Sequence, residues 1–218
     1  MKKIIVACIA TLVSVAAHAD IQLYETGPGE DSSFVRFLNA SDDKASVVNG
    51  AAKIALGNQG DARVSRFYPV KAGSKLSATV QIGNHKLPVE VTAKPGEFIT
   101  IAVVGKDAAA KTLIVRETPT DFNAMRSSVS LSNLDEKCSA ASLTGGAKNA
   151  AIVETVKPAT LQRRLINPVK LSVQANCDGQ AVGAAIDMSQ LQAGERYSVF
   201  LLSLKAGRQA FFVRDNNS

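Results

Sequence analysis

The stretch Leu76-Ser77-Ala78-Thr79-Val80-Gln81-Ile82 alternates strictly between apolar and polar side chains. Successive side chains of a β-strand point to opposite faces, so this stretch places its apolar side chains on one face and its polar ones on the other. The stretch 169–175, Val-Lys-Leu-Ser-Val-Gln-Ala, repeats the alternation in the second half of the chain. One buried face and one solvated face are typical of antiparallel sheets, so both stretches predict such strands.

Other short apolar segments surround these two strands. They cover 33–38, 64–70, 87–91, 98–104 and 113–115, and turns rich in Gly, Pro, Asn and Asp separate them. Strands and turns that alternate every 8–12 residues or so are typical of an antiparallel sandwich or barrel. No segment keeps a helical period over ten or more residues, so little helix is expected. Pro88 cannot donate to a strand ladder, which predicts an edge strand or a bulge at 87–91.

The second half of the chain repeats landmarks of the first half. Ser-Ser-Phe-Val-Arg-Phe-Leu-Asn at 32–39 aligns with 127–133 at an offset of 95 residues, and 95–99 and 114–117 align with 193–198 and 212–215 at an offset of 98. Nearly constant offsets indicate two copies of one domain. The sequence therefore predicts an all-β protein with two tandem immunoglobulin-like antiparallel β-sandwich domains and little helix. The predicted domains are 20–118 and 125–218, with a linker at 119–124.

The first 19 residues have the features of a secretory signal peptide. Lys2 and Lys3 precede an apolar run at 4–17, and Ala-His-Ala at 17–19 predicts cleavage between Ala19 and Asp20. The run is shorter than the roughly 20 residues of a membrane span, and no later run is long enough. We therefore expect a periplasmic protein with no transmembrane segment after signal removal. A lipoprotein site at Cys8 is less favoured, because only four apolar residues precede it.

The charge of the chain is mildly basic. Removal of the signal peptide lowers the formal net charge from +6 to +4. Nucleic-acid-binding domains usually carry a clustered basic face, so no nucleic acid is expected, whereas a weak attraction to an anionic polysaccharide remains open. Four basic residues crowd one part of the second half, where nearby prolines predict loops: Lys157, Arg163, Arg164 and Lys170. They are candidate contacts for a carboxylate-bearing partner, with a merely solvated face as the alternative.

Two cysteines remain after signal removal, Cys138 and Cys177. An even number of cysteines in an oxidising compartment predicts a structural disulfide, and two separate buried thiols are the alternative. The bond would close a loop of about 40 residues and stabilise the fold by about 3–4 kcal/mol in the chain-entropy model. A redox-active pair is not expected, because the chain has no Cys-x-x-Cys motif.

The residues for common catalytic sites are scarce. His85 is the one histidine left after signal removal, and it lies in a predicted turn, where a solvated side chain is the simplest interpretation. The chain has no Gly-x-Ser-x-Gly motif and no set of His and Cys at zinc-ligand spacing. The sequence thus favours a non-catalytic binding or scaffolding protein without a metal or cofactor. A site built on carboxylates or lysines stays open.

Two blocks resemble a known family. Ser-Ser-Phe-Val-Arg-Phe-Leu-Asn-Ala at 32–40 resembles the opening of the alginate O-acetylation family AlgF, and Leu-Ile-Asn-Pro-Val-Lys-Leu at 165–171 resembles its Asn-Pro-Val-Lys segment. The resemblance implies a periplasmic protein required for acetylating alginate or a related exopolysaccharide. It also implies an adaptor for membrane and periplasmic acetyltransferase proteins, which carry out the transfer, and it brings no catalytic residues. The pair Cys138 and Cys177 is not part of the family pattern.

Two other classes of protein compete with this interpretation. A pilus-type periplasmic chaperone also has two immunoglobulin-like domains and acts by β-strand donation, but the similarity between the two halves argues against it. A carbohydrate-binding module usually stacks sugars on aromatic rings, and a chain with no Trp and three Tyr is poorly equipped for stacking.

Overall fold

Strands dominate the structure, which is a computed structural model describing residues 31–121, 123–146 and 148–215. Its first half contains β1 (Ser32–Ala40), β2 (Ala45–Asn49), β3 (Ala52–Leu56), η1 (Gly60–Arg63), β4 (Tyr68–Lys71), β5 (Lys75–Ile82), β6 (His85–Thr92), β7 (Phe98–Val104), η2 (Asp107–Ala109) and β8 (Lys111–Glu117). Its second half contains β9 (Ser127–Asn133), β10 (Ala141–Gly145), β11 (Ala150–Val156), β12 (Thr160–Ile166), β13 (Lys170–Cys177), β14 (Gln180–Ala181), β15 (Ile186–Gln190), β16 (Arg196–Leu204) and β17 (Gly207–Arg214). The predicted all-β class is confirmed, and helix in the described residues is limited to the 3-10 turns η1 and η2.

The first half folds into two sheets, with strand orders β4-β1-β7-β8 and β3-β2-β5-β6. β1 runs parallel to β7, with Val35 opposite Ile99, while the other pairings between strands of this half are antiparallel. The chain reaches β7 from β1 by crossing through the other sheet, which is the kind of connection that parallel strands need. The prediction of a β-sandwich is confirmed. The prediction that its sheets are purely antiparallel is wrong at the central pair, β1 and β7.

The second half repeats this topology, with strand orders β12-β9-β16-β17 and β11-β10-β13-β14, and β15 beside β13. β9 runs parallel to β16, as β1 does to β7. The side chains of Asn39 and Asn133 play matching roles, since each Nδ2 donates to two backbone carbonyls beyond its own strand. These two residues are 94 positions apart, so the offset of 95 was one residue too long. The proposed linker at 119–124 falls between β8 and β9.

Each sandwich encloses its own apolar core. Ala78, Val80 and Ile82 of β5 point into the first core, and the corresponding face of β13 points into the second. Both alternating stretches therefore form the half-buried strands that their sequences predict. β6 ends its sheet, so Pro88 lies on an edge strand as predicted.

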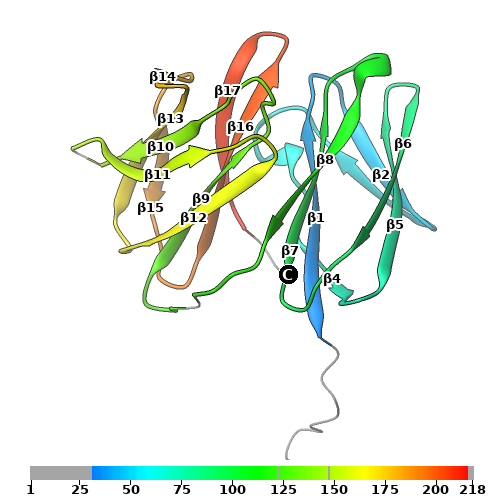
Figure 1. Cartoon of the computed structure of the whole chain (residues 1–218), viewed down its shortest axis with the longest axis horizontal. Coiled ribbons are helices and arrows are strands. Elements are labelled where there is room, and N and C mark those ends of the chain that lie inside the picture. The colour runs from blue at the N-terminus through cyan, green and yellow to red at the C-terminus, as the bar shows by residue number, and fades with distance from the viewer. Residues whose placement is uncertain (1–30, 122, 147, 216–218) are drawn as a thin grey trace, which may run out of the picture.

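A third apolar core lies between the two sandwiches. Its buried residues come from both halves: Leu38, Ala40, Ala102, Val104, Val115, Leu134, Phe200 and Leu202. The sheet containing β1 and β7 therefore faces the sheet containing β9 and β16, and the protein has four layers (Figure 1). Every residue of β7 and of β9 is buried, because these inner sheets are covered on both faces. Two-sided burial explains why 98–104 is almost continuously apolar.

The predicted signal peptide and its cleavage site, Ala19 and Asp20, lie outside the described residues. Among the residues that are described, no helix has the length and apolar character needed to cross a membrane.

Candidate functional site

Charged side chains are buried where the two sandwiches meet. Nη1 of Arg36 in β1 lies 2.7 Å from Oδ1 of Asp215, which directly follows β17. The two side chains are only 4% and 1% exposed. This ion pair joins the first strand of the first half to the end of the second half. We call Arg36, Glu117, Arg163, Arg196 and Asp215 the interface ion cluster.

Glu117, the last residue of β8, makes the corresponding contact from the first half to the second. Its carboxylate accepts from Nε of Arg163 and, at 3.0 Å, from Nη2 of Arg196, and both arginines belong to the second half. Nη2 of Arg163 also lies 3.3 Å from Oδ2 of Asp215. The acid at the end of each half thus reaches an arginine of the other half.

Neutral groups complete the surroundings of Arg36. Its Nε donates to Oγ1 of Thr100 at 2.9 Å, and its Nη2 donates to Oγ of Ser198 at 3.0 Å. The guanidinium carbon lies 4.4 Å from the ring centre of Phe67 and 4.9 Å from that of Phe200. A buried charge costs much free energy unless it is paired and hydrogen-bonded, and Arg36 meets both conditions.

Burial and pairing act in opposite directions on the cluster. Desolvation lowers the pKa of Arg36, although Asp215 opposes this effect. Burial alone would raise the pKa of Asp215, but the charges of Arg36 and Arg163 outweigh it and hold that pKa below its ordinary value. Burial, and then the charge of Arg163, lower the pKa of Arg196. Three guanidinium groups face two carboxylates, so the ionised cluster carries a net charge of +1.

The cluster is suited to fixing geometry rather than to moving protons. Arginine is protonated throughout the physiological range, and both carboxylates are held by guanidinium groups. Nε of Arg196 is buried without a hydrogen-bond partner, and its guanidinium lies 4.6 Å from the ring centre of Phe98. These contacts lock side chains from both halves into one orientation.

Two clefts open beside the cluster. The first, of about 380 Å³, is here called the Asp215 cleft and is lined by Arg36, Asp61, Val64, Ser65, Arg66, Phe67, Phe212, Val213, Arg214 and Asp215. The second, of about 300 Å³, is called the Glu117 cleft and is lined by Arg116, Glu117, Thr118, Pro119, Thr120, Asp121, Leu161, Arg163, Leu165 and Arg196. Each contains three arginines and two acidic side chains among its described residues, so both are net positive.

An exposed arginine marks each cleft. Arg116 pairs with Glu97 at 2.9 Å, and Arg214, its counterpart 98 residues later, pairs with Glu195 at 2.7 Å. Arg66 in the Asp215 cleft is exposed and makes no ion pair with any described residue. Guanidinium groups in these positions suit a carboxylate presented by a partner.

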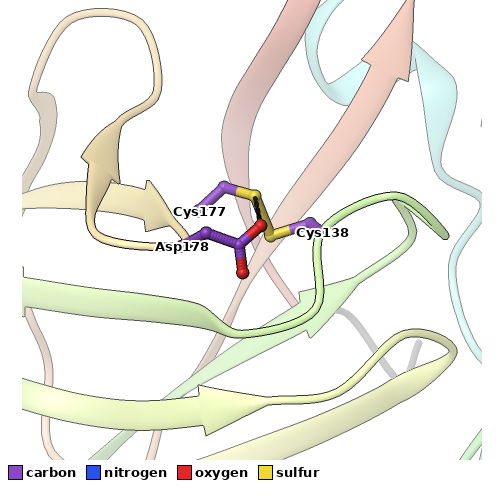
Figure 2. Close-up of side chains that lie close together, drawn as sticks. All are labelled: Cys138, Cys177 and Asp178. Carbon is purple, nitrogen blue, oxygen red and sulfur yellow. Dashed lines mark hydrogen bonds between the residues drawn. A yellow bond between two sulfur atoms is a disulfide. The ribbon is translucent and has the colours of Figure 1, made fainter.

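The predicted disulfide is confirmed, because Cys138 and Cys177 are bonded to each other. The bond ties the loop after β9 to the end of β13, and Asp178 lies beside it (Figure 2). Oδ1 of Asp178 accepts from the hydroxyl of Ser139 and from the backbone of Ala140. The two sulfurs and a carboxylate oxygen lie close together, but a disulfide offers no thiolate for a metal. This group is structural.

The four basic residues predicted as a contact surface do not form one group. Arg163 and Arg164 lie within β12, so their placement in loops was wrong. The prolines that suggested loops flank this strand instead of interrupting it. Neighbouring strand residues point to opposite faces, so Arg163 enters the interface ion cluster while Arg164 donates to the carbonyl of Ala151. Lys157 lies in the turn before β12, and Lys170 begins β13 in another sheet.

The sequence did not single out Arg36, Glu117, Arg196 or Asp215 as site residues. Two signals for them were present. Arg36 interrupts the apolar segment 34–38, and an arginine followed by an acid ends both 114–117 and 212–215. The repeat identified the second signal as a landmark but not as a contact.

The fold and the charged interface define a class: an all-β protein of two sandwiches whose buried ions join the halves and whose clefts lie between them. The chain belongs to the AlgF family, since the family model described as Alginate O-acetyl transferase AlgF matches residues 7–198. The resemblance at 32–40 and 165–171 is thereby confirmed.

Individual relatives carry the same family name. The Alginate biosynthesis protein AlgF of Azotobacter vinelandii is 29% identical over 182 residues, covering 84% of this chain and 77% of that protein. The protein of the same name from Pseudomonas fluorescens is 29% identical over 186 residues, covering 85% and 79%. A solved structure of the C-terminal domain of AlgF from P. aeruginosa is 22% identical, with a TM-score of 0.35, and the match covers 41% of this chain and 98% of that domain.

Proposed function

We propose that this protein is a non-catalytic periplasmic adaptor required for O-acetylation of alginate or a related exopolysaccharide. It would hold together the membrane and periplasmic acetyltransferase proteins. Membership of a family named for alginate O-acetyl transfer supports a role for this protein in that process. The observation that carries the adaptor role is the interface ion cluster. Its charged groups pair with one another across the interface and join the two sandwiches into one body.

Ser65 and His85 are the hydroxyl and the imidazole that we consider as a possible nucleophile and base. Acyl transfer needs a nucleophile within hydrogen-bond reach of a base. Ser65, which lines the Asp215 cleft, donates to the carbonyl of Arg66 and accepts from the backbone of Phe37. His85 begins β6 in an outer sheet and makes no side-chain hydrogen bond to any described residue. These positions support transfer of the acetyl group by other proteins.

The two clefts are the surfaces that we assign to partner proteins. Arg66, Arg116 and Arg214 are exposed there and present guanidinium groups next to apolar walls. Arginines are enriched at protein interfaces, where they bind carboxylates in a bidentate manner. An acidic surface on an acetyltransferase is the complement we expect, and an anionic polysaccharide is the weaker candidate because each cleft also holds two acids.

The first test is to delete the gene in the native strain and to measure polymer yield and ester-linked acetate. We expect polymer to persist and its acetyl esters to be lost. Complementation with Arg66→Glu/Arg214→Glu should leave the esters low, whereas the matched exposed change Ser77→Glu should restore them. Unchanged esters together with loss of a surface fibre would favour the chaperone alternative.

The second test separates an adaptor from an enzyme and examines export. The purified protein should release no acetate from acetylated polymer, and affinity capture from the periplasm should retain an acetyltransferase protein. Acetate release by the purified protein would overturn the adaptor role. The N-terminal sequence of the captured protein should begin at Asp20, and a start elsewhere would contradict the predicted cleavage site.

A further inference from the structure

The contacts between the sandwiches repeat when the two halves are exchanged. The carboxylate of Asp42, in the loop after β1, accepts from the backbone amide of Lys205 at the β16–β17 turn, at 2.9 Å. Glu136, 94 residues later in the loop after β9, pairs with Nζ of Lys111 at the start of β8, at 2.7 Å. β9 corresponds to β1 and the β16–β17 hairpin corresponds to β7–β8. Each half thus uses the same loop to reach the same hairpin of the other half.

Two further contacts between the halves are also repeated when the halves are exchanged. Glu117 and Asp215 are 98 residues apart, and each reaches an arginine of the opposite half. At one border of the interface β8 contacts β12, and at the other border β17 contacts η1, the turn that precedes β4. β12 is the counterpart of β4, so each terminal edge strand lies near the opposite half's equivalent of β4. A reciprocal use of equivalent surfaces is the property of an isologous, twofold interface.

We propose that the two halves are binding partners in their own right, so that the protein is a closed pseudo-twofold dimer within one chain. The binding surface of the first half is the face of the β1/β7 sheet that is turned away from its own sandwich core. Its partner is the corresponding face of the β9/β16 sheet. The linker raises their effective concentration but is not needed for their association. Because a twofold interface is closed, this surface recruits no further copy of the chain.

The interface has the apolar content that association requires. Leu38, Val115 and Phe200 are all fully buried in the core shared between the halves. Separated halves would expose this core as an apolar patch, together with unpaired buried charges. The core also favours unlike halves, because Ala102 occupies in β7 the position that Phe200 occupies in β16. Two first halves would leave the shared core underfilled, and two second halves would crowd it.

The test starts from the folded full chain. A protease recognition sequence is inserted between Thr120 and Asp121, which are both exposed, and the purified protein is cut and examined by sedimentation velocity. At about 1 µM and physiological salt we expect one species with the mass of the intact chain. Two species of about half that mass at 10 µM would overturn the proposal.

Interface variants give the second arm of the test. Ala102→Glu puts a charge into the shared core, while its side chain points away from the first sandwich core. We expect it to weaken association of the cut halves at least about 30-fold, the effect of a hot-spot residue, and we expect Ser77→Glu on an exposed face to have no effect. Phe200→Ala serves if Ala102→Glu fails to fold, and the same weakening is expected. Cut halves of a folded variant that associate as tightly as the parent would contradict the proposed surface.

Discussion

Arg36 is a buried cation, and the carboxylate that it donates to belongs to a residue 179 positions away in the sequence. Asp215→Asn keeps the shape of the side chain but leaves Arg36 without that counter-charge. Removing one partner of a buried ion pair costs about 3–5 kcal/mol, so the free energy of unfolding in urea should fall by about that amount. Glu90→Gln breaks an exposed pair with Lys75 and should change little. Equal effects of the two substitutions would show that burial does not govern the strength of these pairs.

The lowered pKa of Asp215 also predicts a dependence on pH. A carboxyl group whose pKa is lower in the folded than in the unfolded state stabilises the fold fully above its unfolded pKa, about 3.9 for Asp. That stabilisation is lost as the pH falls through the lower folded pKa of Asp215. The difference in unfolding free energy between the parent and Asp215→Asn should therefore be constant from pH 7 to about pH 5 and should shrink below about pH 4. A difference that grows on acidification would contradict this sign.

At the scale of residues, sequence reasoning succeeded where the interaction was covalent and failed where it was electrostatic. Outside the predicted signal peptide the sequence holds two cysteines, which allow one intramolecular bond, so Cys138 and Cys177 could be paired without a structure. Arg36 and Asp215 could each pair with many residues, and only the packing of one sandwich on the other selects their contact. Arg163 was a candidate contact for a partner's carboxylate, but the carboxylates that it pairs with belong to this same chain.

The buried face of a strand could be predicted where the opposite face is exposed to solvent. The alternation in β5 and β13 reports a core on one side and solvent on the other. Both faces of β7 and β9 are buried. No local pattern in either sequence shows which face packs on its own sandwich core and which packs on the other sandwich. The parallel direction of β1 relative to β7 was missed for a related reason, since alternation within a strand carries no information about its neighbour's direction.

The disulfide links two segments of the second sandwich and should stabilise the fold. Replacing both cysteines, Cys138→Ala together with Cys177→Ala, removes a link between residues 39 positions apart. The chain-entropy model predicts a loss of about 4 kcal/mol in the free energy of unfolding. Urea unfolding with and without reductant measures it, and reductant should destabilise the parent but not the double variant. A reductant effect that persists in the double variant would assign it to something other than this bond.

At the scale of the whole molecule, the third core holds the two sandwiches in one fixed arrangement. Sandwiches joined only by residues 119–124 would move independently, and an adaptor of that kind would tether its partners loosely. Here the inner sheets share an apolar core and the interface ion cluster, so the distance between the two clefts is fixed by packing. Partners bound at the Asp215 and Glu117 clefts would then have a fixed relative orientation, which suits the transfer of an acetyl group between proteins.

A shared core also predicts that the two sandwiches unfold together. The chain has no Trp, so Tyr68→Trp in the first half and Phe212→Trp in the second, each at a half-buried position, report on one sandwich apiece. Their urea midpoints should coincide, because opening either sandwich exposes the core of the interface as well as its own. Adding Ala102→Glu should separate the two midpoints, since each sandwich retains its own core while the shared core is lost, and adding Ser77→Glu should not. Separate midpoints in the single-Trp proteins would mean that the interface contributes little free energy, and the two clefts would then be free to move relative to each other.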